Sequence, residues 1–174
     1  MAMRFSAATA AATALDEVRA GVRLLSIARG RSMEEIAGAV RDAKTGLRLG
    51  LASLGEDELR KADADGWSVA MIVGHALAMD EAAHLIARSL ALGRAPEVEV
   101  PYDRAGESKV AKADLLRRLD AAEARLAEAT VLAAGGPTFA HRDLGPLDAR
   151  GWILFIGVHD AMHLHQAADI VRAR

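Results

Sequence analysis

Apolar residues recur at helical spacing along most of the chain, and the alternation that is typical of β-strands is almost absent. An alanine-rich stretch over residues 8–29 predicts a first helix that ends near Gly30. Ser32, followed three positions later by Glu35, matches a capping box and predicts a second helix over about residues 33–54. The N-terminal part of the chain therefore contributes two helices.

Three more helices follow from the same periodicity. The first covers about residues 67–92, the second about 108–133 and the third about 148–172, where Asp148 is placed to cap the N-terminus. One face of the first of these carries an unbroken heptad row, made of Val69, Ile72, Ala76, Met79, Ala83, Ile86 and Leu90. Such rows are typical of helices that pack lengthwise against one another in a bundle.

We therefore expect an all-α fold, a four-helix bundle with an additional N-terminal helix. Residues 1–30 form the N-terminal helical extension, and residues 31–174 form the bundle. The glycine and proline content of residues 133–147 predicts a loop, and residues 56–66 predict a short turn followed by a loop. In the simplest, up-and-down order, the second and fourth helices of the bundle are parallel.

The composition narrows the classes of function. The net charge is -2 and 3% of the residues are aromatic, which argues against nucleic-acid binding. The chain has no cysteine, which excludes disulfides, cysteine zinc ligands and a cysteine nucleophile. No apolar run approaches the roughly 18 residues of a membrane span. The alanine-rich N-terminus faintly resembles a signal sequence, but Asp16 and Glu17 follow closely, so we expect a cytoplasmic protein.

The stretch GVHDAMHLHQ, residues 157–166, contains three of the six histidines. His159 and His163 are four residues apart and share the inward face of the last helix, where two imidazoles can reach one metal ion. His165 is turned toward the outer face. The pair alone is weak evidence for a metal site, and the alternative is two core histidines satisfied by hydrogen bonds, or a partly exposed face.

His75 supplies a third imidazole. It flanks the heptad row described above, and in parallel helices it lies at about the same depth as His159. The spacing predicts a divalent-metal site made by His75, His159 and His163. His84 lies on the opposite side of its helix from His75, and His141 lies in the predicted loop, from which it could approach the site.

Three segments resemble the DinB/YfiT-like superfamily. GWSVAMIVGHALAMDEAAHLI, residues 66–86, resembles its second-helix signature, and GWILFIGVHDAMHLHQAADIVRAR, residues 151–174, is similar to its closing helix with an H-x3-H-x2-Q pattern. LASLGEDELRKADADGWS, residues 51–68, resembles the usual exit from its first helix. The resemblance covers about residues 33–174. It implies a four-helix bundle, often a homodimer with an unusual helix order, that holds a divalent metal by three histidines.

Carried over to this chain, the implied ligands are His75, His159 and His163. Characterised members of the superfamily include thiol-dependent transferases and a thiol-dependent isomerase, in which the metal activates a low-molecular-weight thiol. The isomerase branch tends to replace one closing-helix histidine with glutamate, whereas both histidines are present here. The resemblance therefore implies a metal-dependent enzyme, a thiol-dependent transferase or hydrolase of a small molecule, with zinc or nickel. The alternative is a non-enzymatic metal-binding or structural helical bundle.

Four further residues bear on the predicted site. Gln166 lies on the inward face one turn beyond the last ligand, where its amide can support that ligand or bond to the backbone. Asp160 is a weaker candidate for a group that supports the metal ligands, since we favour a solvated position on the helix for it. HDAMH differs from the zinc-protease motif HExxH by the shorter Asp160, which disfavours protease activity. Arg142 and Arg150 favour an anionic ligand, or are exposed arginines without that role.

Overall fold

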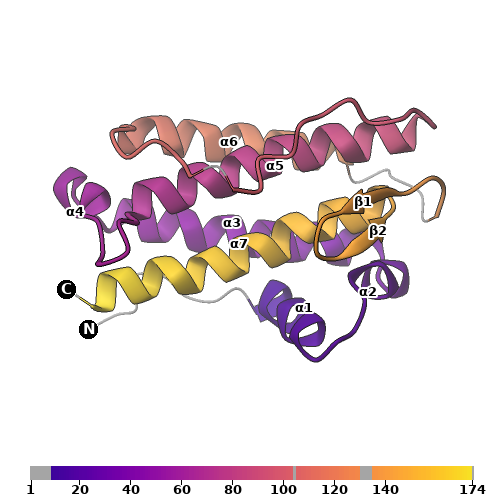
Figure 1. Cartoon of the computed structure of the whole chain (residues 1–174), viewed down its shortest axis with the longest axis horizontal. Coiled ribbons are helices and arrows are strands. Elements are labelled where there is room, and N and C mark those ends of the chain that lie inside the picture. Colours follow the sequence, from indigo (N-terminus) through magenta and orange to yellow (C-terminus); the bar gives the residue numbers. More distant parts are fainter. Residues whose placement is uncertain (1–8, 104, 130–134, 174) are drawn as a thin grey trace.

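The computed structural model describes residues 9–103, 105–129 and 135–173 of the chain. The described residues form seven helices and one two-stranded hairpin (Figure 1). In chain order they are α1 (Thr9–Arg19), α2 (Leu24–Gly30), α3 (Met33–Ala52), α4 (Glu56–Arg60), α5 (Val69–Ala91), α6 (Lys112–Ala129), β1 (Phe139–His141), β2 (Gly145–Leu147) and α7 (Ala149–Arg172). The prediction of an all-α bundle is confirmed. The predicted heptad row on α5 is buried along its whole length.

Helices α3, α5, α6 and α7 form the bundle, with α7 packed against both α3 and α5, and α6 packed against the other side of α3 and α5. Val40 of α3 faces Gly157 of α7, and four residues later Lys44 bonds to Asp160, so α3 and α7 run parallel. Helix α5 runs antiparallel to α7 and parallel to α6, as the colour gradient in Figure 1 shows. The helices are therefore ordered up, down, down, up.

The predicted up-and-down order is wrong. The described residues between α5 and α6, 92–103 and 105–111, return along the length of the bundle instead of turning directly into an antiparallel helix (Figure 1). As a result α3 and α5 are diagonal neighbours, and α6 pairs with α3 in the antiparallel sense through Arg48 and Glu123 at 3.1 Å. The segments 55–66 and 135–148 consequently lie at opposite ends of the bundle.

The predicted N-terminal helix over residues 8–29 is two helices. Gly21 has a φ of 89°, in the left-handed region that glycine adopts without steric cost, and it reverses the chain between α1 and α2. The amide of Val22 donates to the carbonyl of Glu17 at 3.0 Å, which closes α1. Both short helices pack on α7. The division of the chain at residue 30 stays a prediction.

Two predicted caps are confirmed. The Ser32 side chain accepts from the amide of Glu35, whose carboxylate accepts from the Ser32 amide at 2.7 Å, and Asp148 accepts from the amide of Gly151 at 2.9 Å. The predicted loop before α7 contains the β1–β2 hairpin, in which Phe139 pairs with Leu147. The last predicted turn of the 108–133 helix falls partly on residues 130–133, outside the described residues.

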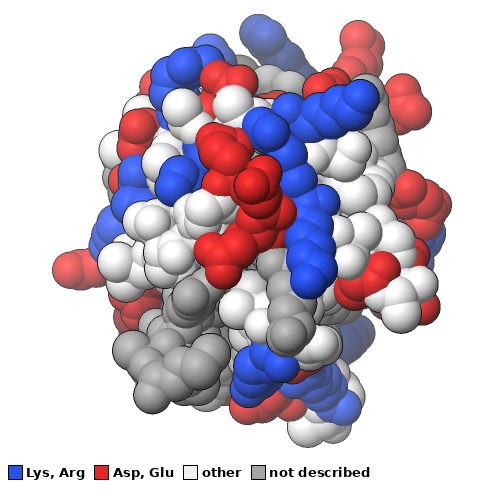
Figure 2. Space-filling model, turned by 90° about the vertical axis from the view of Figure 1, so that its left-hand side faces the viewer, with Lys and Arg blue, Asp and Glu red and all other residues white. Residues whose placement is uncertain are grey.

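Helix α5 is long and apolar enough to cross a membrane by length and composition, but 78% of its most apolar window is buried inside the bundle. The core helix of a globular bundle has the same character. At the end of the bundle shown in Figure 2, acidic and basic side chains lie side by side. That face therefore offers no extended basic surface of the kind that nucleic acids require.

Candidate metal centre

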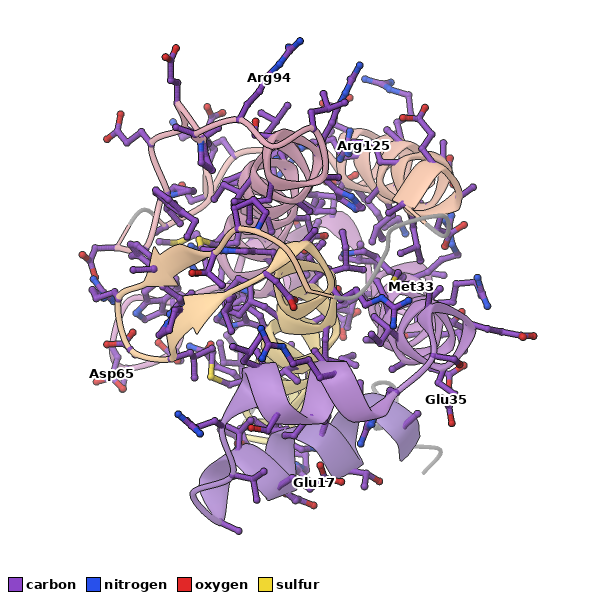
Figure 3. The ribbon with its side chains drawn as sticks, turned by 90° about the vertical axis from the view of Figure 1, so that its right-hand side faces the viewer. Glu17, Met33, Glu35, Asp65, Arg94 and Arg125 are labelled. Carbon is purple, nitrogen blue, oxygen red and sulfur yellow. The ribbon has the colours of Figure 1, made fainter. Side chains whose placement is uncertain are left out.

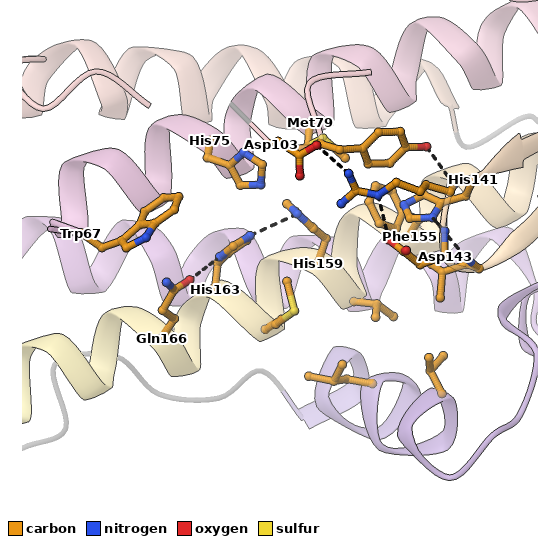
Figure 4. A pocket seen from close by; sticks show the side chains of 17 residues that line it. Trp67, His75, Met79, Asp103, His141, Asp143, Phe155, His159, His163 and Gln166 are labelled. Atoms are coloured by element: carbon orange, nitrogen blue, oxygen red, sulfur yellow. Dashed lines mark hydrogen bonds and ion pairs between the residues drawn. The ribbon is translucent and has the colours of Figure 1, made fainter. Parts of the chain in front are cut away.

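The structure brings together the three histidines that the sequence predicts as ligands. His75 comes from α5 and His159 and His163 come from α7, and one nitrogen from each lies within 4.8 Å of the other two. The ring centroids of His159 and His163 are 4.4 Å apart, and the centroid of His75 lies 5.2 Å from that of His159 and 5.0 Å from that of His163. All three side chains are buried. We call this group the histidine cluster (Figure 4).

The three histidines come together for a different reason than the one predicted from their spacing. Equal depth in two parallel helices was the predicted reason, but α5 and α7 are antiparallel. His75 lies in the first third of α5, and the α7 pair lies near the middle of its helix. Convergence is retained because the two helices are offset along the bundle axis. The inward faces were predicted correctly, and they are sufficient to bring the rings together.

Gln166 fixes the orientation and the tautomer of His163. The Gln166 Oε1 atom lies 2.9 Å from Nδ1 of His163, and because a carbonyl oxygen only accepts, Nδ1 carries the proton. The lone pair of His163 is therefore on Nε2, which points at Nε2 of His159 at 3.1 Å. A neighbouring group that holds one ring nitrogen while the other faces the ion is typical of metal-binding histidines.

Burial keeps the imidazoles of His159 and His163 neutral. It lowers the pKa of His163 to about 4, and it lowers the pKa of His159 well below its ordinary value, with the neighbouring imidazoles adding to that shift. Neutral imidazole is the form that binds a metal ion, since a protonated ring has no free lone pair. Near neutral pH both residues are in the form that can bind.

The distances fit a metal ion. Two nitrogens held at about 2.05 Å from one ion lie about 2.9 Å apart at a right angle and about 3.3 Å apart at a tetrahedral angle. The observed 3.1 Å between His159 and His163 lies between these values. Hydrogen bonding alone explains His163 but not His159, whose Nδ1 is buried without a partner among the described residues. The alternative of two satisfied core histidines is therefore weakened.

A cavity of about 570 Å³ opens beside the histidine cluster. Besides the three histidines and Gln166, its described lining is Leu15, Val18, Trp67, Met79, Tyr102, Asp103, His141, Arg142, Asp143, Leu144, Phe155, Val158 and Met162. The wall is mostly apolar, and the charged side chains come from residues 103, 142 and 143. An ion in the cluster would therefore face a space large enough for a small organic molecule.

The fold and the cluster agree with the sequence comparison. Residues 39–167 match the model of the DinB superfamily, which is more than half of the chain. The chain belongs to the DinB superfamily. No curated protein and no solved structure matches it. Membership and the buried histidine cluster together fit a metal-binding protein.

The other three histidines of this DinB superfamily member lie outside the cluster. His141, on β1, lines the cavity as the sequence allowed, and its Nδ1 accepts from the backbone amides of Asp143 and Leu144 at 3.1 and 3.3 Å. His84 is turned away from the cluster but is buried, and burial beside Lys44 lowers its pKa to about 4. His165 is half-buried on α7.

The anionic-ligand hypothesis loses its geometric basis. Arg142 lines the cavity, but it bonds to Asp103 at 2.7 Å and to Asp143 at 3.4 Å, and it lies over the Tyr102 ring at 4.6 Å. Arg150 is not among the described residues that line the cavity, and it donates to the carbonyl of Arg31. The N-termini of α5 and α7 lie at opposite ends of the bundle, so they do not act on one ligand.

Sequence reasoning missed a second buried polar group, the lysine cluster of Lys44, Asp80 and Asp160. The Lys44 ammonium on α3 bonds to Asp160 on α7 at 2.6 Å and to Asp80 on α5, and all three side chains are completely buried. The prediction that Asp160 is solvated is wrong. Because Asp160 is bound to Lys44, it is not placed as the general base of an HExxH-like protease. One signal was available, since Lys44 lies on the apolar face between Val40 and Leu47.

Proposed function

We propose that the chain is a metal-dependent enzyme that binds one divalent ion through His75, His159 and His163 and acts on a small molecule. The observation that carries the proposal is the position of three buried, clustered imidazoles in the wall of a cavity of about 570 Å³. Three protein ligands with open positions are typical of catalytic sites, whereas structural zinc sites are closed by four.

The reaction class that we propose is thiol-dependent transfer or hydrolysis. A bound divalent ion supplies Lewis acidity, which lowers the pKa of a water or thiol or polarises a carbonyl. The chain has no cysteine, so a thiol nucleophile must come from a low-molecular-weight thiol. Gln166 holds the His163 ring in its binding tautomer, and the apolar ring of Phe155 packs beside His159 with the ring centroids 5.1 Å apart.

We propose zinc or nickel as the metal, because neutral imidazole ligands suit both ions. Imidazole sets also accept copper, so availability and geometry select the ion. The homodimer and the cytoplasmic location stay predictions.

Metal analysis of protein purified without a histidine tag tests the proposal. We expect about one equivalent of metal in the wild type and its loss in His159→Ala. His165→Ala is the matched control, since it removes an imidazole from the same helix outside the cluster. Metal in neither the wild type nor protein reconstituted with zinc or nickel would contradict the proposal. A screen of thiols against small electrophiles and esters then separates an enzyme from a non-catalytic metal-binding bundle.

A further inference from the structure

Helix α1 forms one wall of the cavity that faces the histidine cluster. Leu15 and Val18 of α1 line it together with Val158 and Met162 of α7. Figure 3 shows α1 and α2 on one side of α7 and α5 on the other, so α7 lies between the N-terminal helices and the helix that carries His75. The family match begins at residue 39, so this wall comes from a segment outside it.

The position of α1 is held by packing and by an ion pair. Ala11 and Ala14 have no exposed surface, and Leu15 is 5% exposed. Glu17 accepts from Arg31, just before α3, at 3.1 Å. The left-handed turn at Gly21 then directs α2 back onto α7. A wall held by these contacts can select ligands by shape.

The surface that α1 presents to the cavity is apolar. Its nearby charges, Asp16 and Arg19, pair with each other at 3.6 Å on the exposed side of the helix. On the α7 side the neighbouring wall is also apolar, with Val158 and Met162 one turn apart, next to the row of His159 and His163. The cavity that borders the cluster therefore has an apolar part, formed by Leu15, Val18, Val158 and Met162, that reaches α1.

We infer that α1 is the specificity wall of this site, and that the substrate carries an uncharged, apolar group that extends from the metal toward Leu15 and Val18. The inference rests on the proposed function, because it takes the cavity to be the substrate site. Each methylene buried against this wall should raise affinity about fourfold, until the group fills the space.

Binding of ethanethiol, butanethiol and hexanethiol to the cobalt-loaded protein tests the inference, with thiolate-to-cobalt absorption as the signal. We expect affinity to rise about fourfold per added methylene in the wild type, until the group fills the space. Val18→Trp should remove most of that gain for hexanethiol and leave ethanethiol binding within about twofold. Val18→Ser, which adds no bulk, should weaken hexanethiol severalfold and spare ethanethiol. The matched control is Val22→Trp, since Val22 is 43% exposed and is not among the described lining residues.

Equal affinities for the three thiols, or identical chain-length dependence in the wild type and both Val18 variants, would overturn the inference. Failure of the protein to bind cobalt would instead contradict the proposed function. In that case hexanol is added to the metal-free protein and the methyl resonances of Leu15, Val18 and Met162 are followed. Saturable shifts of these resonances support the apolar wall on its own, and their absence overturns it.

Discussion

The histidine cluster and the lysine cluster share helices α5 and α7, and His159 and Asp160 are consecutive residues, yet the two groups differ in charge, closure and surroundings. The lysine cluster joins three helices through an ammonium and two carboxylates, with no exposed surface. The histidine cluster contains His159 and His163, whose rings burial keeps neutral, and it borders a cavity. One turn of α7 thus carries a polar group suited to hold helices together and another suited to hold a ligand.

The two clusters differ because they offset the free-energy cost of burying polar groups in different ways. Burial lowers the pKa of Lys44 and raises that of Asp160, and their mutual attraction opposes both shifts. Charges in the core are tolerated only with such partners. Imidazoles avoid the cost by staying neutral, which also leaves lone pairs for an ion. The lysine cluster should therefore govern stability, and the histidine cluster should govern binding.

The largest effect is expected from Lys44→Met, which leaves two carboxylates buried without their cation. The free energy of unfolding should fall by about 3–5 kcal/mol, measured by urea denaturation. In the triple variant Lys44→Met, Asp80→Asn, Asp160→Asn the charges are gone, and most of that loss should be recovered. A loss below about 1 kcal/mol in Lys44→Met would show that the lysine cluster does not hold the helices together.

Acid should destabilise the protein through His84, which lies beside the lysine cluster. Burial, with smaller contributions from Lys44 and Arg125, lowers its pKa from 6.5 to about 4. Between these values the unfolded chain binds a proton that the folded chain does not. The contribution of His84 is therefore complete above pH 6.5 and is lost by up to about 3 kcal/mol as pH falls to 4. His84→Gln should flatten this part of the unfolding profile, and an unchanged slope would contradict the assignment.

An intermediate effect is expected at the edge of the histidine cluster. Gln166→Ala removes the acceptor that holds His163 in its binding tautomer. Metal affinity should fall about 10- to 100-fold, measured by competition with a chromogenic chelator, while stability without metal changes little. Met162→Ala is the control, because Met162 lines the cavity and is 41% exposed. Equal affinities of the wild type and Gln166→Ala would show that Gln166 does not support the site.

The smallest effect is expected from Arg48→Gln, one turn from Lys44 on α3. Arg48 pairs with Asp120 at 2.7 Å and Glu123 at 3.1 Å, but its side chain is 31% exposed. Solvent-exposed ion pairs contribute about 0–1 kcal/mol to stability. Urea denaturation of this variant beside Lys44→Met compares a partly exposed ion pair with a buried one. A loss as large as that of Lys44→Met would remove the distinction.

Helical periodicity predicted the faces of the helices and hence the histidine cluster, because burying an apolar row also orients its polar neighbours. Periodicity did not give the order of the helices, since residues 92–111 carry none and either direction of α6 buries the same row. Only the family resemblance implied an unusual order. The lysine cluster could not be predicted either. A lone Lys44 on an apolar face identifies no partner, and its two carboxylates come from helices 36 and 116 positions away.

X-ray absorption at the zinc edge of zinc-loaded protein tests the central claim most directly. The histidine cluster predicts a first shell of nitrogen and oxygen atoms at about 2.0–2.1 Å, with the multiple scattering of three imidazoles. In His75→Ala the imidazole scattering should fall to two rings. A shell without imidazole scattering, or a spectrum that His75→Ala leaves unchanged, would contradict a metal centre at these three residues.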